Sequence, residues 1–377
     1  MRPVSFITIN SFHAIPVTRY IIGLISGDCC RVAECHFQGD PIPVAPENYT
    51  AIGTFPNRKA FNSQSISFKI LKYLRLGRQL LSSIRTGSVL YLIDFQLLAV
   101  LTVLRTVLRI GRSVPIVYHQ FELIDPTTLT PLNRIIWSLA LRSAVTADLC
   151  IFPETNRRDY FCRLSGVPVS STWILPNTCS AQPVELPHPA ATFPAGRGKP
   201  VVVGHIGQLG PDHYYREFAE LIRRCAGFPI SFLVIGGLSP KVEGALRSVG
   251  NPNLTLLGQI PHEQLAGYYQ KIDFGLILYK GVDLCFEYCA PNKLYEYWSH
   301  GIKVIAHPLT GLLPVFSDPV QGSLVDLAAP DAFERITSTL LAGNPDRDRL
   351  RSLFREQFGI EHHLPELNRR LLALQTP

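Results

Sequence analysis

Short apolar runs alternate with helix-like segments along most of the chain, and this alternation limits the possible folds more than any other feature. The runs are VSFITI (4–9), SVLYLI (88–93), PIVYH (115–119), LCIF (149–152), VVVGHIG (201–207), ISFLVIG (230–236), NLTLLG (253–258), FGLILY (274–279) and KVIAH (303–307). Strands that are apolar throughout and separated by helices are typical of parallel sheets with both faces covered. The alternation therefore predicts an α/β fold.

The length of the chain indicates two domains, because 377 residues exceed what one hydrophobic core usually accommodates. A proline-rich break at 179–199 is typical of a linker. We expect two doubly wound, Rossmann-like domains, at 1–178 and 200–350, that face a cleft. Residues 351–377 are expected to form a helical tail that packs back on the first domain.

The composition argues against several classes of protein. With 46% hydrophobic and 17% charged residues, the chain is expected to fold rather than to be disordered. The nine cysteines are scattered without a CxxC pair or zinc-ligand spacing, which favours a reducing compartment and no metal site. No secretory signal pattern precedes the first strand, so a cytoplasmic chain is expected. The longest apolar stretch, 88–104, is interrupted by Asp94 and Gln96, which favours a strand and a helix over a membrane span.

The basic charge lies in the first half of the chain. Residues 1–175 hold 18 Lys and Arg against 10 Asp and Glu, whereas residues 176–377 hold 18 against 19. Within the first half, residues 58–112 hold ten basic side chains and one acid, Asp94. Such asymmetry points to an anionic partner. No zinc-finger, RRM or similar motif accompanies the charge, which argues against nucleic acid.

Residues 66–85 read as a basic amphipathic helix. A helical wheel gathers Ile66, Ile70, Tyr73, Leu74, Leu80, Leu81 and Ile84 on one arc and leaves Lys69, Lys72, Arg75, Arg78 and Arg85 outside it. The helix could pack its apolar stripe on the sheet as an ordinary surface helix. It could also contact anionic lipid head groups or an acceptor through Lys69, Lys72, Arg75 and Arg78.

Ligands of doubly wound sheets bind at the carboxyl ends of the strands. After the run at 201–207, Gly207 and Gly210 allow the backbone to approach a phosphate, and Arg216 follows as a possible phosphate partner. Glycines in such a turn can also be purely structural, and an arginine there can simply be solvated.

The stretch 290–308 is the stronger signal. Pro291 and Asn292 mark an abrupt helix start, whose free N–H groups near 293–295 would favour an anion, and Lys293 adds a positive charge. Glu296 is then placed to accept hydrogen bonds from a ribose. Its carboxylate could instead only stabilise the helix N-terminus.

The segment PNKLYEYWSHGIKVIAHP (291–308) resembles the donor-site motif of GT-B glycosyltransferases, especially the retaining family 4. The segments 150–178 and 253–279 are similar to other parts of that family, in the same order. The resemblance implies that Glu296 binds the ribose hydroxyls and that Lys293 and the Gly207 turn face the diphosphate. It also implies that the backbone around Gly258 and Ile260 holds the base. The further donor-binding candidates are Gly210, Arg216, Asn292 and Leu294.

In the first domain, VYHQFEL (117–123) resembles the family's VYDxHEL run, which would place His119 and Glu122 near the sugar and the acceptor. A histidine ending a strand can carry a proton or be a satisfied structural residue. The sequence also departs from the family. Tyr288 stands where a second glutamate is common, with Glu287 one residue away as the catalytic candidate, and Phe121 replaces a histidine. No basic residue follows the glycine turn until Arg216.

The resemblance implies transfer of a sugar from a nucleotide-diphosphate sugar with retention, without a metal or other cofactor. A basic first domain suits a saccharide or lipid-linked acceptor at an anionic membrane surface, and hence polysaccharide or cell-envelope glycan synthesis. The protein would be cytoplasmic, either free or peripheral at the inner face of the membrane. A nucleotide-sugar epimerase of the same fold and a non-catalytic GT-B partner subunit are the alternatives.

Overall fold

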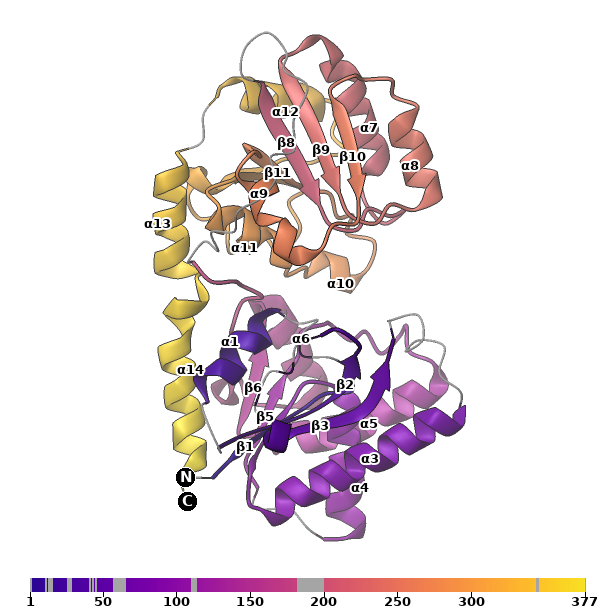
Figure 1. Cartoon of the computed structure of the whole chain (residues 1–377), viewed down its shortest axis with the longest axis vertical. Coiled ribbons are helices and arrows are strands. Elements are labelled where there is room, and N and C mark those ends of the chain that lie inside the picture. Colours follow the sequence, from indigo (N-terminus) through magenta and orange to yellow (C-terminus); the bar gives the residue numbers. More distant parts are fainter. Residues whose placement is uncertain are drawn as a thin grey trace. The chain divides into compact units, whose positions relative to one another are not determined.

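The computed structural model describes residues 2–10, 12, 16–25, 29–40, 42, 44, 46–56, 66–109, 114–181, 200–343 and 346–376. These residues form two compact units. The first unit is Met1–Asn177 with His363–Pro377, and the second is Thr178–His362. Each contains a parallel sheet with helices packed against it (Figure 1). The prediction of two doubly wound, Rossmann-like domains is confirmed.

The first unit contains a seven-stranded parallel sheet in the order β3-β2-β1-β4-β5-β6-β7. Its strands are β1 (Val4–Ile7), β2 (Cys30–Phe37), β3 (Tyr49–Phe55), β4 (Val89–Leu92), β5 (Ile116–His119), β6 (Leu149–Phe152) and β7 (Thr172–Ile174). Its helices are α1 (Pro16–Leu24), α3 (Ile66–Arg85), α4 (Phe95–Val107), α5 (Pro131–Ala144) and α6 (Thr155–Ser165).

The second unit contains a six-stranded parallel sheet in the order β10-β9-β8-β11-β12-β13. Its strands are β8 (Val201–Ile206), β9 (Ile230–Ile235), β10 (Leu254–Gly258), β11 (Phe274–Ile277), β12 (Lys303–Ala306) and β13 (Gly322–Leu324). Its helices are α7 (Tyr215–Arg224), α8 (Pro240–Arg247), α9 (Ala266–Tyr269), α10 (Leu284–Glu287), α11 (Asn292–Ser299), α12 (Ala332–Leu341) and α13 (Arg347–Gln357).

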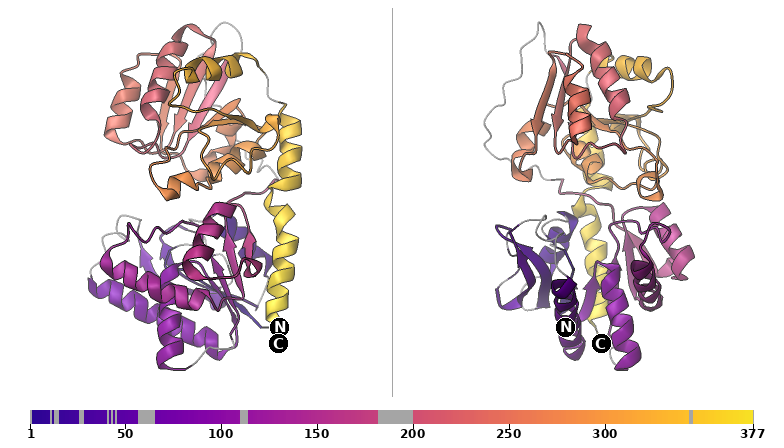
Figure 2. Two further views of the ribbon diagram at one scale, coloured as in Figure 1. Left: turned by 180° about the vertical axis from the view of Figure 1, so that it is seen from behind. Right: turned by 90° about the vertical axis from the view of Figure 1, so that its right-hand side faces the viewer.

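Helices cover both faces of the second sheet (Figure 2), and apolar side chains form a core on each face. Helices α9, α11 and α13 contribute to one core, while α7, α8 and α12 contribute to the other. The strand order reverses between β8 and β11, as it does between β1 and β4 in the first unit. Such a reversal opens a crevice at the carboxyl edge, which is where ligands of these sheets bind.

The chain ends meet in the first unit. Helix α14 (Ile360–Gln375) leads to the C-terminus, and the N–H of Arg2 donates to the carbonyl of Gln375 at 3.1 Å. The Gln375 side chain in turn donates to the carbonyl of Arg2 at 3.0 Å, so the two ends lie side by side (Figure 1). These bonds attach the end of α14 to the start of β1.

Four strands were not predicted from the sequence. β2 and β3 lie beyond β1, toward one edge of the first sheet. Both contain polar residues, so neither shows the continuous apolar run by which the other strands were predicted. β7 and β13 have only three residues each. Pairing with an already formed neighbour supports such strands, and their own sequences do not reveal it.

The helix predicted at 66–85 is confirmed as α3, but its buried face matches the predicted arc only in part: Leu80 is buried and Tyr73 and Ile84 pack against the core, as predicted. Lys72, assigned to the polar side, is buried with 7% of its surface exposed, whereas Leu74, assigned to the apolar arc, is 66% exposed. Leu76 and Leu80 are fully buried and define the packed face. The wheel selects the most apolar arc of the helix, whereas the packing of α3 in the first unit buries a face that also includes Leu76.

The side chain of Lys69 lies outside the described residues. Arg75 and Arg78 are exposed, as the wheel predicted, and Arg75 donates to the carbonyl of Ile52 at 2.8 Å. Leu71, on the same turn, is also exposed. The outward face of α3 therefore combines leucine with arginine.

The apolar stretch at 88–104 divides into β4 and α4, as predicted, with Asp94 between them. The Asp94 carboxylate accepts from the Thr8 hydroxyl at 2.6 Å, the Ile9 N–H at 2.7 Å and the Asn10 amide at 3.2 Å. It thereby fixes the chain just after β1. Among the described helices, none is both long enough and apolar enough to cross a bilayer.

Replacement of Asp94 is predicted to destabilise the first unit. Asp94→Ala leaves the donors of Thr8, Ile9 and Asn10 without their acceptor, which should cost about 3 kcal/mol. Urea unfolding followed by tryptophan fluorescence measures the loss. Asp125→Ala is the control, because Asp125 accepts only exposed bonds from Thr127 and should cost less than about 1 kcal/mol. Equal losses in the two variants would contradict the role of Asp94.

Candidate functional site

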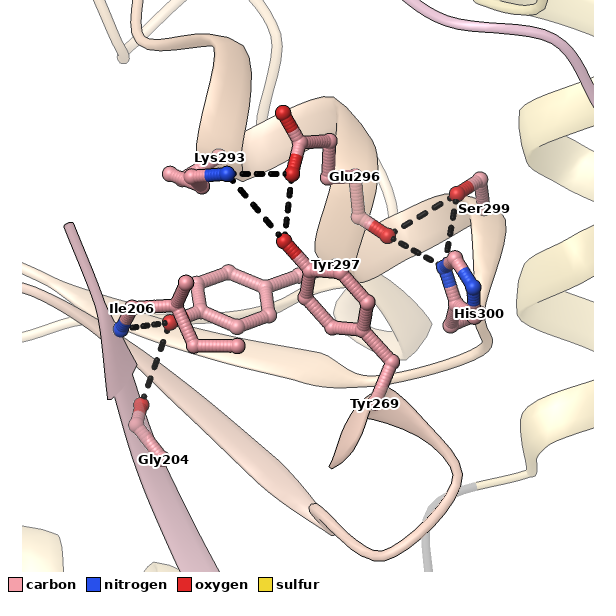
Figure 3. A network of polar contacts seen from close by, with 8 residues as sticks. All are labelled: Gly204, Ile206, Tyr269, Lys293, Glu296, Tyr297, Ser299 and His300. Carbon is pink, nitrogen blue, oxygen red and sulfur yellow. Dashed lines mark hydrogen bonds and ion pairs between the residues drawn. The ribbon is translucent and has the colours of Figure 1, made fainter. Parts of the chain in front are cut away.

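Helix α11 is attached to the second sheet through Tyr297. The Tyr297 hydroxyl accepts from the N–H of Ile206 at 2.8 Å and donates to the carbonyl of Gly204 at 3.2 Å (Figure 3). Gly275 of β11 leaves room for the ring, because a Cβ there would lie 2.6 Å from it. Tyr297 therefore joins α11 to the two strands at which the strand order reverses.

The carboxylate of Glu296 lies at the centre of a small polar network. Tyr269 donates to its Oε2 through a short hydrogen bond, and Lys293 Nζ lies 2.5 Å from the same oxygen. Lys293 also reaches the Tyr269 hydroxyl at 3.4 Å. The other carboxylate oxygen points away from both partners (Figure 3). Glu296 is 8% exposed and oriented through Oε2, and no described residue bonds its other oxygen, which is left to accept from a ligand.

The protonation of this network follows from its burial. Burial raises the pKa of Tyr269 well above its usual value, and the charge of Glu296 adds to the shift, so the phenol keeps its proton and donates. The Tyr269 ring stacks on His300 at 4.5 Å. Burial also lowers the pKa of His300, whose Nδ1 lies 2.9 Å from the Glu296 carbonyl and carries the proton. A neutral imidazole therefore supports the tyrosine.

Sequence reasoning missed Tyr269 and His300. Tyr269 belongs to α9, 27 positions before Glu296, and nothing in the local sequence connects the two. His300 lies in the motif itself, only four residues after Glu296, but its role depends on the stacked tyrosine. Only the packing of α9 on α11 reveals both residues.

The glycine turn after β8 is packed against the neighbouring turn after β9. A Cβ at Gly236 would lie 1.9 Å from the Gly207 carbonyl, and Gly236 has a φ of +136° that disfavours other residues. The N–H of Gly207 donates to Ile235 at 2.8 Å and that of Leu209 to Gly237 at 3.0 Å. The turn is thus close-packed, and these two amides are already paired.

The other predicted donor-binding residues lie in the same unit. Arg216 is exposed on the first turn of α7 and donates to the Tyr215 hydroxyl at 3.2 Å. The Gly258 carbonyl accepts from the N–H of Gly236 at 2.7 Å, and Ile260 packs against the core. The remaining candidates differ in exposure: Asn292 is exposed, Leu294 is fully buried, and the Gly210 N–H donates to His213 Nδ1 at 3.3 Å.

Glu287 fixes a loop in the structure. Its Oε1 accepts from the N–H of Thr310 at 3.1 Å and from the Thr310 hydroxyl through a short bond. Its own carbonyl accepts from the N–H of Gly311 at 2.9 Å. Glu287 therefore connects α10 to the loop that follows β12.

In the first unit, His119 is completely buried at the end of β5. Its Nδ1 lies 2.7 Å from the Tyr91 hydroxyl, and its ring lies 3.9 Å from that of Phe121. Burial lowers the pKa of His119 to about 3, so the ring is neutral. Glu122, three residues later, is exposed. The structure thus separates the two residues, with His119 in the core and Glu122 at the surface.

The buried His119 predicts a pH-dependent stability. Its pKa falls from 6.5 to about 3 on folding, so below pH 6.5 the unfolded chain gains a proton that the folded chain rejects. Stability should therefore decrease as the pH falls, by about 2 kcal/mol between pH 7 and pH 5 from this group. His119→Asn keeps an acceptor for Tyr91 and should flatten the dependence in urea unfolding. The exposed His362→Asn is the control, and a slope unchanged in His119→Asn would contradict the assignment.

Comparisons with known proteins can now be set beside this geometry. Residues 199–343 match the family model described as Glycosyl transferases group 1. No curated protein matches the chain significantly. Within the described residues, no group of three or more His, Cys, Asp or Glu is arranged to hold a metal ion.

The chain is similar to several solved structures over nearly its full length. Alr3699/HepE from Anabaena, in complex with UDP, is 13% identical with a TM-score of 0.68, covering 99% of this chain and 100% of that one. Sucrose-phosphate synthase from Thermosynechococcus elongatus is 17% identical with a TM-score of 0.67 and coverages of 99% and 100%. The lipopolysaccharide outer core galactosyltransferase WaaB is 14% identical with a TM-score of 0.65 and coverages of 98% and 99%.

At these identities the structural likeness defines the fold, which is GT-B. The family match supplies the class of activity, because it covers the whole of the second sheet and of the Glu296 network. The protein is therefore a glycosyltransferase of the GT-B fold, and residues 199–343 of its second unit match the group 1 glycosyl transferase model.

Proposed function

We propose that the second unit binds a nucleotide-diphosphate sugar, whose sugar is transferred to a saccharide or lipid-linked acceptor. The Glu296 carboxylate is the observation that supports this most. One of its oxygens is held by Tyr269 and Lys293, and the other is directed outward at the carboxyl edge of the sheet (Figure 3). An acid oriented in this way suits a pair of ribose hydroxyls. The complexes of Alr3699/HepE with UDP and with UDP-glucose favour a uridine nucleotide as the first donor to test.

The chemistry of the transfer matches the charges at this edge. Positive charge develops on the sugar ring and negative charge on the departing diphosphate. A helix N-terminus and an ammonium group can stabilise the leaving diphosphate. Pro291 provides no side-chain cap to α11, and Lys293 follows in its first turn. On the resemblance to family 4, we propose retention at the anomeric carbon without a divalent ion or other cofactor.

The roles in the first unit follow from exposure. Glu122 is at the surface and is proposed to contact the acceptor or the sugar, whereas the fully buried His119 is proposed to shape the loop beneath it. Glu287 is proposed to position the loop at Thr310 for the sugar.

The outward face of α3 supports an acceptor at a membrane. Leu71 and Leu74 are 42% and 66% exposed, beside the exposed Arg75 and Arg78. Exposed leucines beside arginines suit the boundary between anionic head groups and acyl chains. We therefore propose that the enzyme acts on its acceptor at the inner face of a membrane, in polysaccharide or cell-envelope glycan synthesis. The match to the galactosyltransferase WaaB is in keeping with this pathway class.

The donor site is tested by calorimetric titration with UDP, GDP and ADP and with their 2′-deoxy analogues. The wild type should prefer one base and the ribonucleotide. Glu296→Ala should weaken binding about 10- to 100-fold and abolish the preference for ribose, because the outward oxygen is removed. Glu356→Ala, an exposed acid of the same unit, should bind like the wild type. If the wild type binds no nucleotide, the proposed function is wrong.

Tyr269→Phe is predicted to have a smaller effect of the same kind. Loss of the phenol frees one bond that orients Glu296, so affinity for the preferred nucleotide should fall about 3- to 10-fold. The matched control is Tyr268→Phe. It removes the same hydroxyl group from the adjacent tyrosine, which is half-buried. Similar affinities for the two variants would show that Tyr269 does not orient the acid.

The membrane contact is tested by flotation with phosphatidylcholine vesicles, with and without phosphatidylglycerol. The wild type should float with the anionic vesicles only. The double variant Leu71→Glu/Leu74→Glu should reduce the bound fraction about tenfold. Leu313→Glu/Leu341→Glu replaces two exposed leucines of the second unit and should have no effect. Flotation that is insensitive to the α3 variant would contradict the assigned surface.

A further inference from the structure

The turn after β8, residues 207–214, offers little to a diphosphate. Its sequence, GQLGPDHY, contains no lysine or arginine. The N–H groups of Gly207, Leu209 and Gly210 are all paired within the protein, with Ile235, Gly237 and His213. A diphosphate at this edge must therefore be neutralised by side chains from elsewhere.

Lys280 is brought to this turn by the strand order. It follows β11, which pairs directly with β8 at the point where the order reverses. The Lys280 N–H donates to the carbonyl of Asp212 at 3.1 Å, which joins the two segments. Its Nζ lies 5.1 Å from the centre of the Tyr214 ring. A basic side chain therefore lies beside the turn although the turn itself has none.

The ammonium of Lys280 is available to a ligand. It is half-exposed, and apart from the contact with Tyr214 it has no ion pair or hydrogen bond with any described residue. Lys293, by contrast, lies 2.5 Å from Glu296. The exposed Arg216 bonds Tyr215. Of these three cations, only Lys280 has no polar partner.

The neighbours of Lys280 place its charge at the same edge. Burial is the main cause that lowers the pKa of His213, and the charge of Lys280 lowers it further, while the charge of Asp212 opposes the shift. The Tyr214 ring contacts Lys280 and also packs on His307, with ring centres 4.9 Å apart. His307 follows β12, so the lysine lies among the ends of β8, β11 and β12.

We propose that Lys280 supplies the positive charge that binds the diphosphate of the donor. The inference rests on the proposed function, since it assigns a residue to the same nucleotide site. An ammonium group is a compact charge that suits phosphate oxygens, and the Tyr214 ring restricts its position. Lys280 thus replaces a basic residue that the glycine turn lacks. Lys293 remains to orient Glu296 and to meet the diphosphate from the α11 side.

The experiment compares nucleoside diphosphates with nucleosides in binding to the whole protein. UDP, GDP and ADP are titrated calorimetrically, and uridine, guanosine and adenosine are measured by displacement. In Lys280→Ala, the ratio of nucleoside to diphosphate dissociation constants should fall about 10- to 100-fold, with nucleoside binding unchanged. Unchanged nucleoside binding also shows that the variant is folded. Lys280→Arg should restore most of the ratio.

Lys303→Ala is the matched control, because Lys303 is a half-buried lysine at the amino end of β12 in the same sheet. Its ratio should equal that of the wild type. An unchanged ratio in Lys280→Ala would overturn this inference and leave the proposed function standing. If the wild type binds none of the three diphosphates, the proposed function fails and the inference fails with it.

Discussion

The hydroxyl of Tyr297 is the contact on which the second unit's site depends. It pairs with Ile206 and Gly204 of β8, and its ring fits over Gly275 of β11. Both groups on β8 are buried, so the tyrosine satisfies backbone atoms that would otherwise be costly. Because this contact holds α11 against the sheet, Glu296, the residue before Tyr297, is fixed relative to the crevice at the strand reversal.

Carboxylates have two different uses in this structure. Asp94, Glu154 and Glu287 each accept from backbone N–H groups, and each fixes a turn or a helix start near the carboxyl edge of a sheet. Among the described residues, Glu296 is bonded by side chains only, through one oxygen. An acid whose partners leave an oxygen unoccupied can accept a ligand, whereas an acid used by the backbone cannot do so without loss of local structure. This difference separates Glu296 from the structural acids.

The basic side chains of the protein also differ in whether packing leaves their charge available to a partner. Lys72 is buried on α3, and the ammonium of Lys293 is shared between Glu296 and any ligand that reaches it. Arg75 and Arg78 remain exposed beside leucines, and Lys280 remains without a polar partner among the described residues. Net charge alone therefore does not show which cations can bind a partner, because it also counts ammonium groups that are buried or already paired.

The sequence by itself determined the fold class, the positions of the central strands along the chain and the place of the ribose-binding candidate. Continuous apolar runs specify buried parallel strands, and a proline-marked helix start is a local property. Only the tertiary structure decided which face of α3 is buried, that Tyr269 orients Glu296, and that Lys280 lies beside the turn after β8. These features join residues from separate elements through packing and strand order, and such long-range contacts leave no periodic signal in a single sequence.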